Sequence, residues 1–142
     1  MQRGFTLVEL VMAIALAGAL LVMVITRAGK WLDRLAVDRA AQEIVGFYQI
    51  ARFSAIYRSN RVRVELGPDT LRAVYEGVAD STFLTAPGPG PLGVAISTSR
   101  SQIWLHPNGI GAAGANTKII LRRGTEAESL TTSRVGRMRR WR

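Results

Sequence analysis

The hydrophobic pattern of the chain begins with one long apolar stretch. From Phe5 to Ile25, Glu9 is the only charged residue. A helix over these 21 residues rises about 32 Å, which is enough to cross the hydrocarbon core of a bilayer. The pattern therefore predicts a membrane-spanning helix over residues 5–26.

Helical periodicity continues beyond this stretch. Between Val37 and Ala55, apolar residues recur at alternating four- and three-residue spacing and form one stripe, with most charged residues off it. We expect residues 27–60 to be an amphipathic continuation of the same helix, because Ser59-Asn60 interrupts the periodicity. Aromatic residues at this spacing are interpreted as core and membrane-interface residues rather than as a ligand cage. They are Trp31, Phe47, Tyr48, Phe53 and Tyr57.

After Asn60 the pattern changes to strict alternation. Val62, Val64 and Leu66 fall on one face of a strand, and residues 67–70 turn the chain into a second strand. Further apolar, β-prone runs occur at residues 94–98, 102–105, 118–121 and 130–135. Residues 61–142 are therefore expected to form an antiparallel β-sheet packed against the C-terminal half of the helix, which makes the chain an α+β protein.

Composition narrows the classes of function. The chain has no cysteine, so disulfides and thiolate metal sites are excluded. Its formal net charge is +9, and from Ser81 onward nine basic residues face only Glu126 and Glu128. Such a surplus attracts polyanions or anionic lipid surfaces. Of the 19 basic residues 17 are arginine, which is typical either of codon bias or of selection for bidentate phosphate contacts.

A secretory signal peptide is the alternative interpretation of the apolar stretch. Ala15, Ala17 and Ala19 offer the A-x-A spacing of a cleavage site, but the apolar run continues past them, and an acid inside it is unexpected for a signal peptide.

The distribution of charge gives a hint about the orientation of the span in the membrane. Only Arg3 precedes the span and several basic residues follow it, which by charge alone would place the C-terminal side in the cytoplasm.

Glu9 needs its own explanation, because a carboxylate in hydrocarbon is disfavoured by roughly 2.5 to 3.5 kcal/mol. The positive end of the helix dipole offsets only about 0.3 to 1 kcal/mol of this. The side chain therefore either snorkels to the headgroups or has a cationic partner.

The stretch Arg3-Gly4-Phe5-Thr6-Leu7-Val8-Glu9 resembles the processing site of type IV prepilins and type II secretion pseudopilins. In that family a short basic leader ends in glycine, and phenylalanine opens an apolar helix with glutamate at its fifth position. The resemblance implies that residues 1–4 are a leader peptide, and that prepilin peptidase cuts between Gly4 and Phe5 and methylates the new amine of Phe5. It also implies that Glu9 drives assembly by pairing with the N-terminal amine of a neighbouring subunit.

The same resemblance implies a location and partners. The chain would be a single-pass inner-membrane protein with a periplasmic C-terminal domain, against the charge hint, and would be incorporated into a pseudopilus or pilus. Its partners would be prepilin peptidase, other major and minor pseudopilins or pilins, the inner-membrane assembly platform and membrane lipid.

Two short C-terminal elements narrow the resemblance to the GspH/FimT group of minor pseudopilins. Ile103-Trp104-Leu105-His106-Pro107-Asn108-Gly109 is similar to the aromatic-Pro-x-Gly turn between late strands of that group, and Gly136-Arg137 is similar to its Gly-Arg near the C-terminus. The order of helix and strands resembles that group over nearly the whole chain.

The sequence predicts no catalytic residue, metal site or cofactor. His106 is the only histidine, which is too few ligands for an ordinary metal site. Residues 88–93 and 109–114 fit G-x-G-x-x-G, but neither stretch opens a helix in a βαβ unit, so both are interpreted as loops. Glu126 and Glu128 lie in a loop-like stretch and are expected to be solvated surface charges. We therefore interpret the protein as non-enzymatic.

The basic C-terminus is the surface constellation with a candidate chemistry. Arginine binds phosphate bidentately, and Trp141 is suited to stacking on an exposed base. Gly136-Arg137-Met138-Arg139 also resembles the Gly-Arg-x-Arg element associated with DNA capture in the FimT branch. By that resemblance Arg137 and Arg139 would contact phosphate, with help from Arg134, Arg140 and Arg142. The alternatives are a solvated basic tail and a tail that pairs with acidic surfaces on adjoining pseudopilins.

Two functional hypotheses share this fold. The first is a minor pseudopilin, a structural subunit of a type II secretion pseudopilus or a type IV pilus-like filament that takes part in protein secretion or pilus assembly. The second is a pilus-associated DNA-binding subunit for DNA uptake.

Overall fold

The computed structural model describes residues 6–77, 81–112 and 116–141, with the side chains of residues 24–27 excepted. The chain divides into two compact units, Met1–Leu32 and Asp33–Arg142. One helix, α1 (Leu7–Tyr57), runs through both.

The first unit is an apolar helix with exposed side chains. An 18-residue window of α1 has a mean hydropathy of 2.7, and none of that window is buried. By length and composition this helix is able to cross a membrane, as the apolar pattern predicts. A water-exposed helix with such a composition would be costly, so the segment is built for an apolar environment.

The helix ends three residues before the predicted Asn60. Ser59 takes a left-handed conformation with φ of 50°, and its N–H donates to the carbonyl of Ile56. The N–H of Asn60 donates to the carbonyl of Ala55. These two bonds form a Schellman motif in which serine takes the place usually held by glycine.

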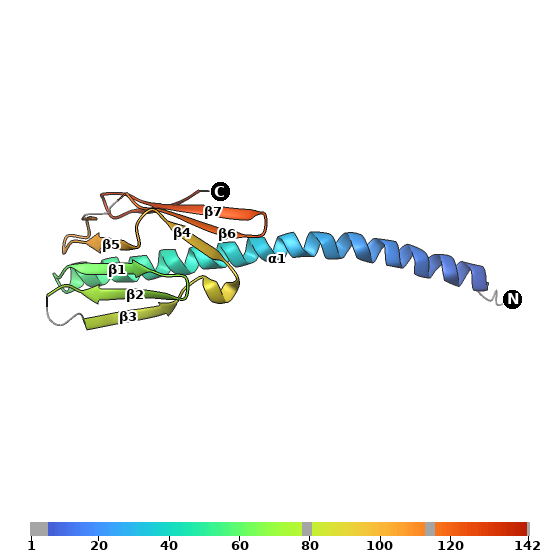
Figure 1. Ribbon diagram of the computed structural model, residues 1–142, viewed down its shortest axis with the longest axis horizontal. Coiled ribbons are helices and arrows are strands. Elements are labelled where there is room, and N and C mark those ends of the chain that lie inside the picture. Colours follow the sequence, from blue (N-terminus) through green and yellow to red (C-terminus); the bar gives the residue numbers. More distant parts are fainter. Residues whose placement is uncertain (1–5, 78–80, 113–115, 142) are drawn as a thin grey trace. The chain divides into compact units, whose positions relative to one another are not determined.

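In its described residues, the second unit adds eight strands to the C-terminal half of α1. Figure 1 shows how they are arranged along the helix. They are β1 (Val62–Leu66), β2 (Thr70–Tyr75), β3 (Ser81–Pro87), β4 (Ala95–Thr98), β5 (Gln102–Leu105), β6 (Lys118–Arg123), β7 (Glu126–Thr132) and β8 (Met138–Trp141). A 3-10 turn, η1 (Gly90–Leu92), precedes β4. All pairings are antiparallel, as predicted, but the strands form two four-stranded sheets. Sheet A has the order β3-β2-β1-β5 and sheet B the order β4-β6-β7-β8.

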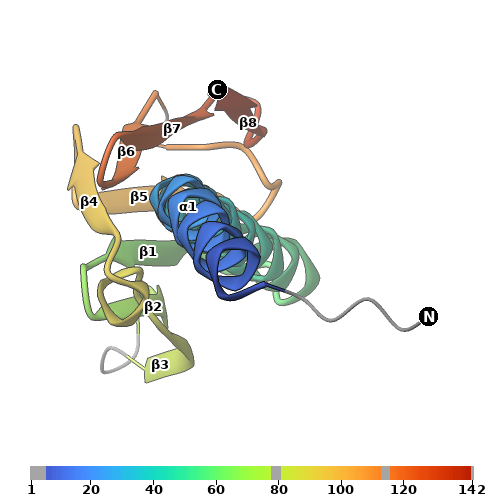
Figure 2. The same ribbon diagram turned by 90° about the vertical axis from the view of Figure 1, so that its right-hand side faces the viewer.

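The segment between β4 and β5 carries the chain from sheet B to sheet A, and Figure 2 shows these two strands next to each other. Ser99 N–H donates to the carbonyl of Lys118 in sheet B, and Leu66 N–H in sheet A donates to the carbonyl of Ser101. Because this short corner bonds to both sheets, it fixes one against the other.

The core fills the space between α1 and the inner faces of both sheets. The predicted helical stripe is confirmed, since every one of its members is buried: Val37, Ala41, Ile44, Tyr48, Ala51 and Ala55. The aromatic interpretation is only partly right. Phe47 and Tyr48 are core residues, whereas Phe53 and Tyr57 are exposed and stack on each other with ring centroids 6.1 Å apart.

Two predictions about the strands are wrong. Residues 126–132 form the regular strand β7 rather than a loop followed by a strand, and Glu128 is buried rather than solvated. The strands β3 and β8 are additional to those that the pattern indicates. β3 is an edge strand that ends at Pro87, where a missing N–H does not disrupt a ladder.

Candidate assembly and anion-binding sites

The start of α1 is closed by a capping box. Thr6 N–H lies 3.5 Å from Oε2 of Glu9, and Glu9 N–H donates to Oγ1 of Thr6 at 3.4 Å. Each side chain satisfies a backbone N–H that the first turn of a helix leaves without a partner. The Thr-x-x-Glu spacing is a capping signal in the sequence, although Glu9 was singled out there for its charge in an apolar segment and for the family motif. Gly4 and Phe5, the predicted cleavage and methylation residues, lie outside the described residues.

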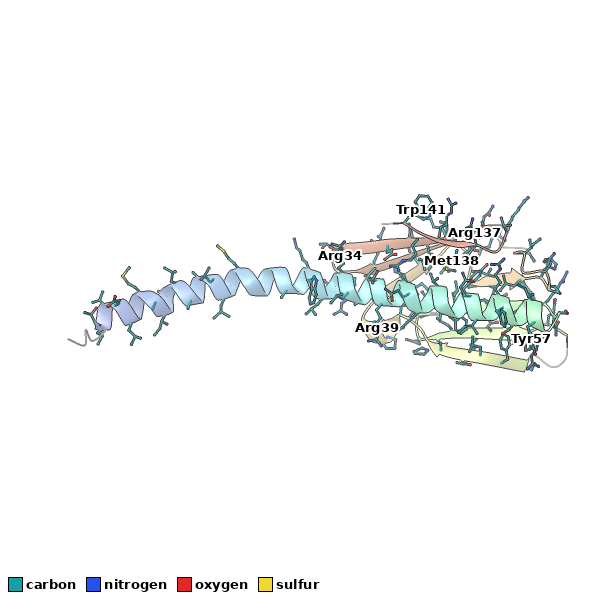
Figure 3. The ribbon with its side chains drawn as sticks, turned by 180° about the vertical axis from the view of Figure 1, so that it is seen from behind. Arg34, Arg39, Tyr57, Arg137, Met138 and Trp141 are labelled. Atoms are coloured by element: carbon teal, nitrogen blue, oxygen red, sulfur yellow. The ribbon has the colours of Figure 1, made fainter. Side chains whose placement is uncertain are left out.

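The last strand, β8, separates the predicted C-terminal residues onto two faces. Successive side chains of a strand point to opposite faces. Met138 packs on the core, so Met138 and Arg140 face α1, whereas Arg139 and Trp141 face away from it. Figure 3 shows Trp141 on the side of β8 away from α1 and Met138 between the strand and the helix.

Arg140 is the centre of an ion-pair network on the inner face. Its Nε donates to Oε1 of Glu128 at 2.5 Å and its Nη2 to Oε2 at 3.0 Å, and Nη2 also donates to Asp38 of α1. The Glu128 side chain is only 3% exposed, so the guanidinium compensates a buried carboxylate. These hydrogen bonds, the one to Glu128 first, raise the pKa of Arg140 above its ordinary value. The network ties β7 and β8 to α1.

Trp141 is anchored to sheet B through its indole N–H. Its Nε1–H donates to Oγ1 of Thr131 on β7 at 2.9 Å, and the residue remains 54% exposed. An exposed indole with a fixed orientation is a surface for stacking. Sequence reasoning selected Trp141 for stacking, but not the threonine that orients it.

Arg134 and Arg137 lie in the turn that precedes β8, and both are exposed. The turn is closed by Gly136 N–H donating to the carbonyl of Ser133, and by Arg137 N–H donating to Oγ of Ser133 at 3.3 Å. Arg134, Arg137 and Arg139 form no ion pair among the described residues, in contrast to Arg140. Arg142 lies outside the described residues.

The two glycines of the predicted C-terminal elements meet each other over Arg52. Gly109 and Gly136 have φ of 74° and 72°, values that favour glycine. Arg52 Nε donates to the carbonyl of Gly109 at 2.9 Å, and its Nη2 donates to the carbonyl of Val135 at 3.3 Å. A Cβ on Gly136 would collide with the carbonyl oxygen of Gly109 and would lie 2.8 Å from Arg52 Nε. Arg52 thereby docks both turns on α1, a role that its place off the apolar stripe did not reveal.

His106, the only histidine, is half-buried at one end of sheet A. It lines an open cavity of about 320 Å³ with Arg61, Glu76, Trp104 and Ala112. The backbone N–H of His106 donates to the carbonyl of Ile110, and this bond shapes the turn at Gly109. Among the described residues, no three metal-ligating side chains are gathered.

Comparison with known proteins identifies the N-terminal motif. Residues 1–25 match the family model described as the prokaryotic N-terminal methylation motif. The chain is also similar to the competence protein ComGD of Bacillus subtilis (strain 168), with 25% identity over 118 residues that cover 83% of this chain and 80% of ComGD.

Among solved structures, the type IV minor pilin FimU of Pseudomonas aeruginosa (strain PAO1) has a similar fold. One crystal form gives a TM-score of 0.65 at 14% identity, covering 77% of this chain and 90% of FimU. A second form gives 0.61 at 14% identity, covering 74% and 92%. At this identity the likeness concerns the fold, a long N-terminal helix packed against antiparallel sheets.

Proposed function

We propose that this chain, a type IV pilin-like protein by its N-terminal motif and its fold, is a minor pilin or pseudopilin. It serves as a structural subunit of a type IV pilus-like filament or a type II secretion pseudopilus, and the pilus is favoured because the similar structures are those of a type IV minor pilin. The observation that carries the proposal is the methylation motif joined to an apolar helix with a single acid, Glu9.

In this proposal prepilin peptidase removes residues 1–4 and methylates Phe5. The processed helix stays in the inner membrane, and the second unit faces the periplasm until the assembly platform passes the subunit to other pilins. The capping box holds Glu9 at the first turn, next to the new N-terminus. An amine brought to this carboxylate by a neighbouring subunit would offset the cost of keeping the charge in lipid.

The test is incorporation into the filament. Glu9→Gln removes the charge but keeps the side-chain size, so the processed chain is expected in the membrane and missing from the sheared filament fraction. Glu43→Gln is the matched control, since Glu43 lies on the same helix outside the apolar segment. If Glu9→Gln enters the filament as the wild type does, the proposed pairing is wrong.

A DNA-binding function is the second candidate, and it is favoured by the three exposed C-terminal arginines that lack ion-pair partners among the described residues: Arg134, Arg137 and Arg139. The similarity to a protein named as a competence protein accords with it. In this candidate the three arginines bind phosphates of DNA. Arg140 has a structural role, because Glu128 and Asp38 occupy its guanidinium.

Titration with duplex DNA at several salt concentrations tests this candidate. Three phosphate contacts predict a slope of log K against log salt of about −2.7. Arg137→Ala/Arg139→Ala should weaken binding strongly and reduce the slope by about 1.8. Arg39→Ala/Arg72→Ala removes the same charge from α1 and β2 and should have little effect. Duplex binding that survives the first double substitution would exclude these contacts.

A further inference from the structure

The outer face of sheet B, the face turned away from α1, is a second basic surface beside the C-terminal turn. Strand alternation and the buried positions Ile119, Leu121 and Leu130 define which side chains face outward. The outward residues that matter here are Lys118 and Arg122 on β6, Ser129 and Thr131 on β7, and Arg139 and Trp141 on β8.

Charges of opposite sign are separated across this sheet. The structure describes all four strands, and their only acids, Glu126 and Glu128, have the inward parity. The inward bases are ion-paired, Arg140 with Glu128 and Arg123 with Asp33 of α1. The outward bases Lys118, Arg122 and Arg139 are exposed and form no ion pair among the described residues. The uncompensated positive charge of sheet B is therefore on its outer face.

Sheet A shows the opposite arrangement. On its outer face Arg63 pairs with Glu65, and Arg61 pairs with Glu76 at its end. Arg63 also lies over the ring of Trp104, 5.4 Å from the centroid. These two ion pairs neutralise part of the charge on sheet A, where Arg72 of β2 is exposed without an ion pair among the described residues, so sheet B carries more uncompensated positive charge than sheet A.

The register of sheet B sets the spacing of its charges. Lys118, Thr131 and Arg139 lie opposite one another on successive strands, so the two cations are about 10 Å apart across the sheet. Arg122 follows Lys118 by four residues, about 13 Å along β6. Thr131 of β7 separates Lys118 from Arg139, and the half-buried Ile120 lies between Lys118 and Arg122 on β6. The indole of Trp141, held by Thr131, lies beside Arg139.

We propose that the outer face of sheet B binds single-stranded nucleic acid, with a base stacked on Trp141 and phosphates at Lys118, Arg122 and Arg139. An exposed sheet face with one anchored aromatic ring and cations about 10 to 13 Å apart fits a strand whose bases are splayed out, whereas a duplex keeps its bases stacked and offers none to the indole. This inference rests on the proposed DNA-binding function, and it adds Lys118 and Arg122 on β6 and a preference for single strands.

The experiment compares a labelled 20-nucleotide oligothymidine with a 20-base-pair duplex, by fluorescence anisotropy on the full chain in neutral detergent. Trp141→Ala should weaken single-strand binding about 5- to 150-fold and leave duplex binding within about twofold. Trp141→Phe keeps a stacking ring and should retain most of the affinity. Lys118→Ala/Arg122→Ala should reduce the salt slope for the single strand by about 1.4. Arg39→Ala/Arg72→Ala is the charge-matched control.

The outcomes separate this inference from the function on which it rests. If the wild type binds both DNAs and the substitutions at Trp141, Lys118 and Arg122 change neither, the C-terminal turn alone binds DNA and the outer face does not. If the wild type binds neither DNA, the DNA-binding function fails as well. The wild type could instead bind vesicles containing anionic lipid but not oligothymidine, with vesicle binding lost on substitution of Trp141, Lys118 and Arg122. That result would make the face a lipid-binding surface and overturn the proposal.

Discussion

At the scale of single residues, neighbouring arginines on one strand do different work. Arg139 and Arg140 are adjacent in β8, yet alternation directs one to solvent and the other to the buried Glu128. A buried ion pair gains little over a well-packed apolar pair, but removing one partner leaves an uncompensated charge. The role of each arginine is therefore indicated less by its residue type than by the face of the strand on which it lies.

Arg140→Ala is expected to destabilise the second unit by about 3 kcal/mol, which lowers its Tm by roughly 10 to 20 °C. The reason is that the carboxylate of Glu128, 3% exposed, loses the guanidinium that compensates it. Thermal unfolding followed by circular dichroism measures the change. Arg139→Ala, one residue away and exposed, is the control and should shift the Tm very little. Restored stability in Arg140→Ala/Glu128→Gln would support the explanation, and a Tm unchanged in Arg140→Ala would refute it.

Tyr48 gives a prediction of the opposite sign. Its hydroxyl is buried in the core without a hydrogen-bond partner among the described residues. Leaving such a group unsatisfied costs about 1 to 3 kcal/mol, so Tyr48→Phe should raise the Tm. Tyr57→Phe, at an exposed position, should have no effect.

The advantage of Tyr48→Phe should also grow at alkaline pH. Burial raises the pKa of the Tyr48 phenol above its ordinary value of 10.0. The unfolded chain then loses this proton before the folded chain does, so the wild type loses stability as the pH rises above 10.0, and the phenylalanine variant lacks this loss. Unfolding at pH 8 and pH 10.5 would measure the difference. A gap between the two proteins that narrows with pH would contradict the assignment.

At the scale of elements, the sequence predicted the helices and strands whose hydrophobic pattern lies within one continuous stretch of residues. The helical stripe from Val37 to Ala55 and the alternating strand β1 are written in residue spacing, and both formed as expected. The first half of β7, residues 126–129, was missed because its inward position Glu128 is charged, and its burial depends on the ion pair with Arg140, twelve residues later. The division into two sheets was missed because it depends on the corner at Ser99–Ser101, whose bonds join distant strands.

The candidate sites follow the same rule. The C-terminal arginines were selected from the basic charge of the C-terminus and from the resemblance of residues 136–139 to the Gly-Arg-x-Arg element. Which of them form ion pairs is set by the face of β8 that each occupies and by Asp38 on α1, 102 residues away in the chain from Arg140. The sequence did not indicate Lys118 and Arg122 as site residues. They share a face with Arg139 and Trp141 only because β6 pairs with β7 and β7 with β8. Cross-strand register is a non-local property that no single stretch encodes.

The two docked turns give a prediction at this scale. Gly136→Ala should destabilise the turn before β8, because a Cβ at positive φ would also collide with the carbonyl of Gly109 and with Arg52. Arg52→Ala should loosen the same turn by removing two hydrogen bonds from α1. Since both changes release one contact, their effects on the Tm should be less than additive in the double variant. Full additivity would show that Arg52 does not act on this turn.

At the scale of the whole molecule, stability belongs to one of the two units. Every member of the core cluster lies between Val37 and Leu130, with partly buried residues extending it to Met138. The described side chains of the apolar segment contribute none of that burial. In the proposed function, the apolar segment therefore enters lipid or a filament without removing any core residue from the second unit.

A fragment of residues 30–142 is therefore expected to fold alone and remain soluble, with a Tm within a few degrees of that of the second unit in the full chain. Removing the N-terminal residues takes away exposed apolar surface but no core residue, so the free energy of unfolding should be almost unchanged. Circular dichroism and analytical ultracentrifugation of the fragment would measure fold and association. The Tm of the full chain in neutral detergent is the reference. A fragment that is unfolded, or that folds only as an oligomer, would mean that the second unit depends on contacts beyond its own core. The stability of the second unit would then not be independent of the apolar segment.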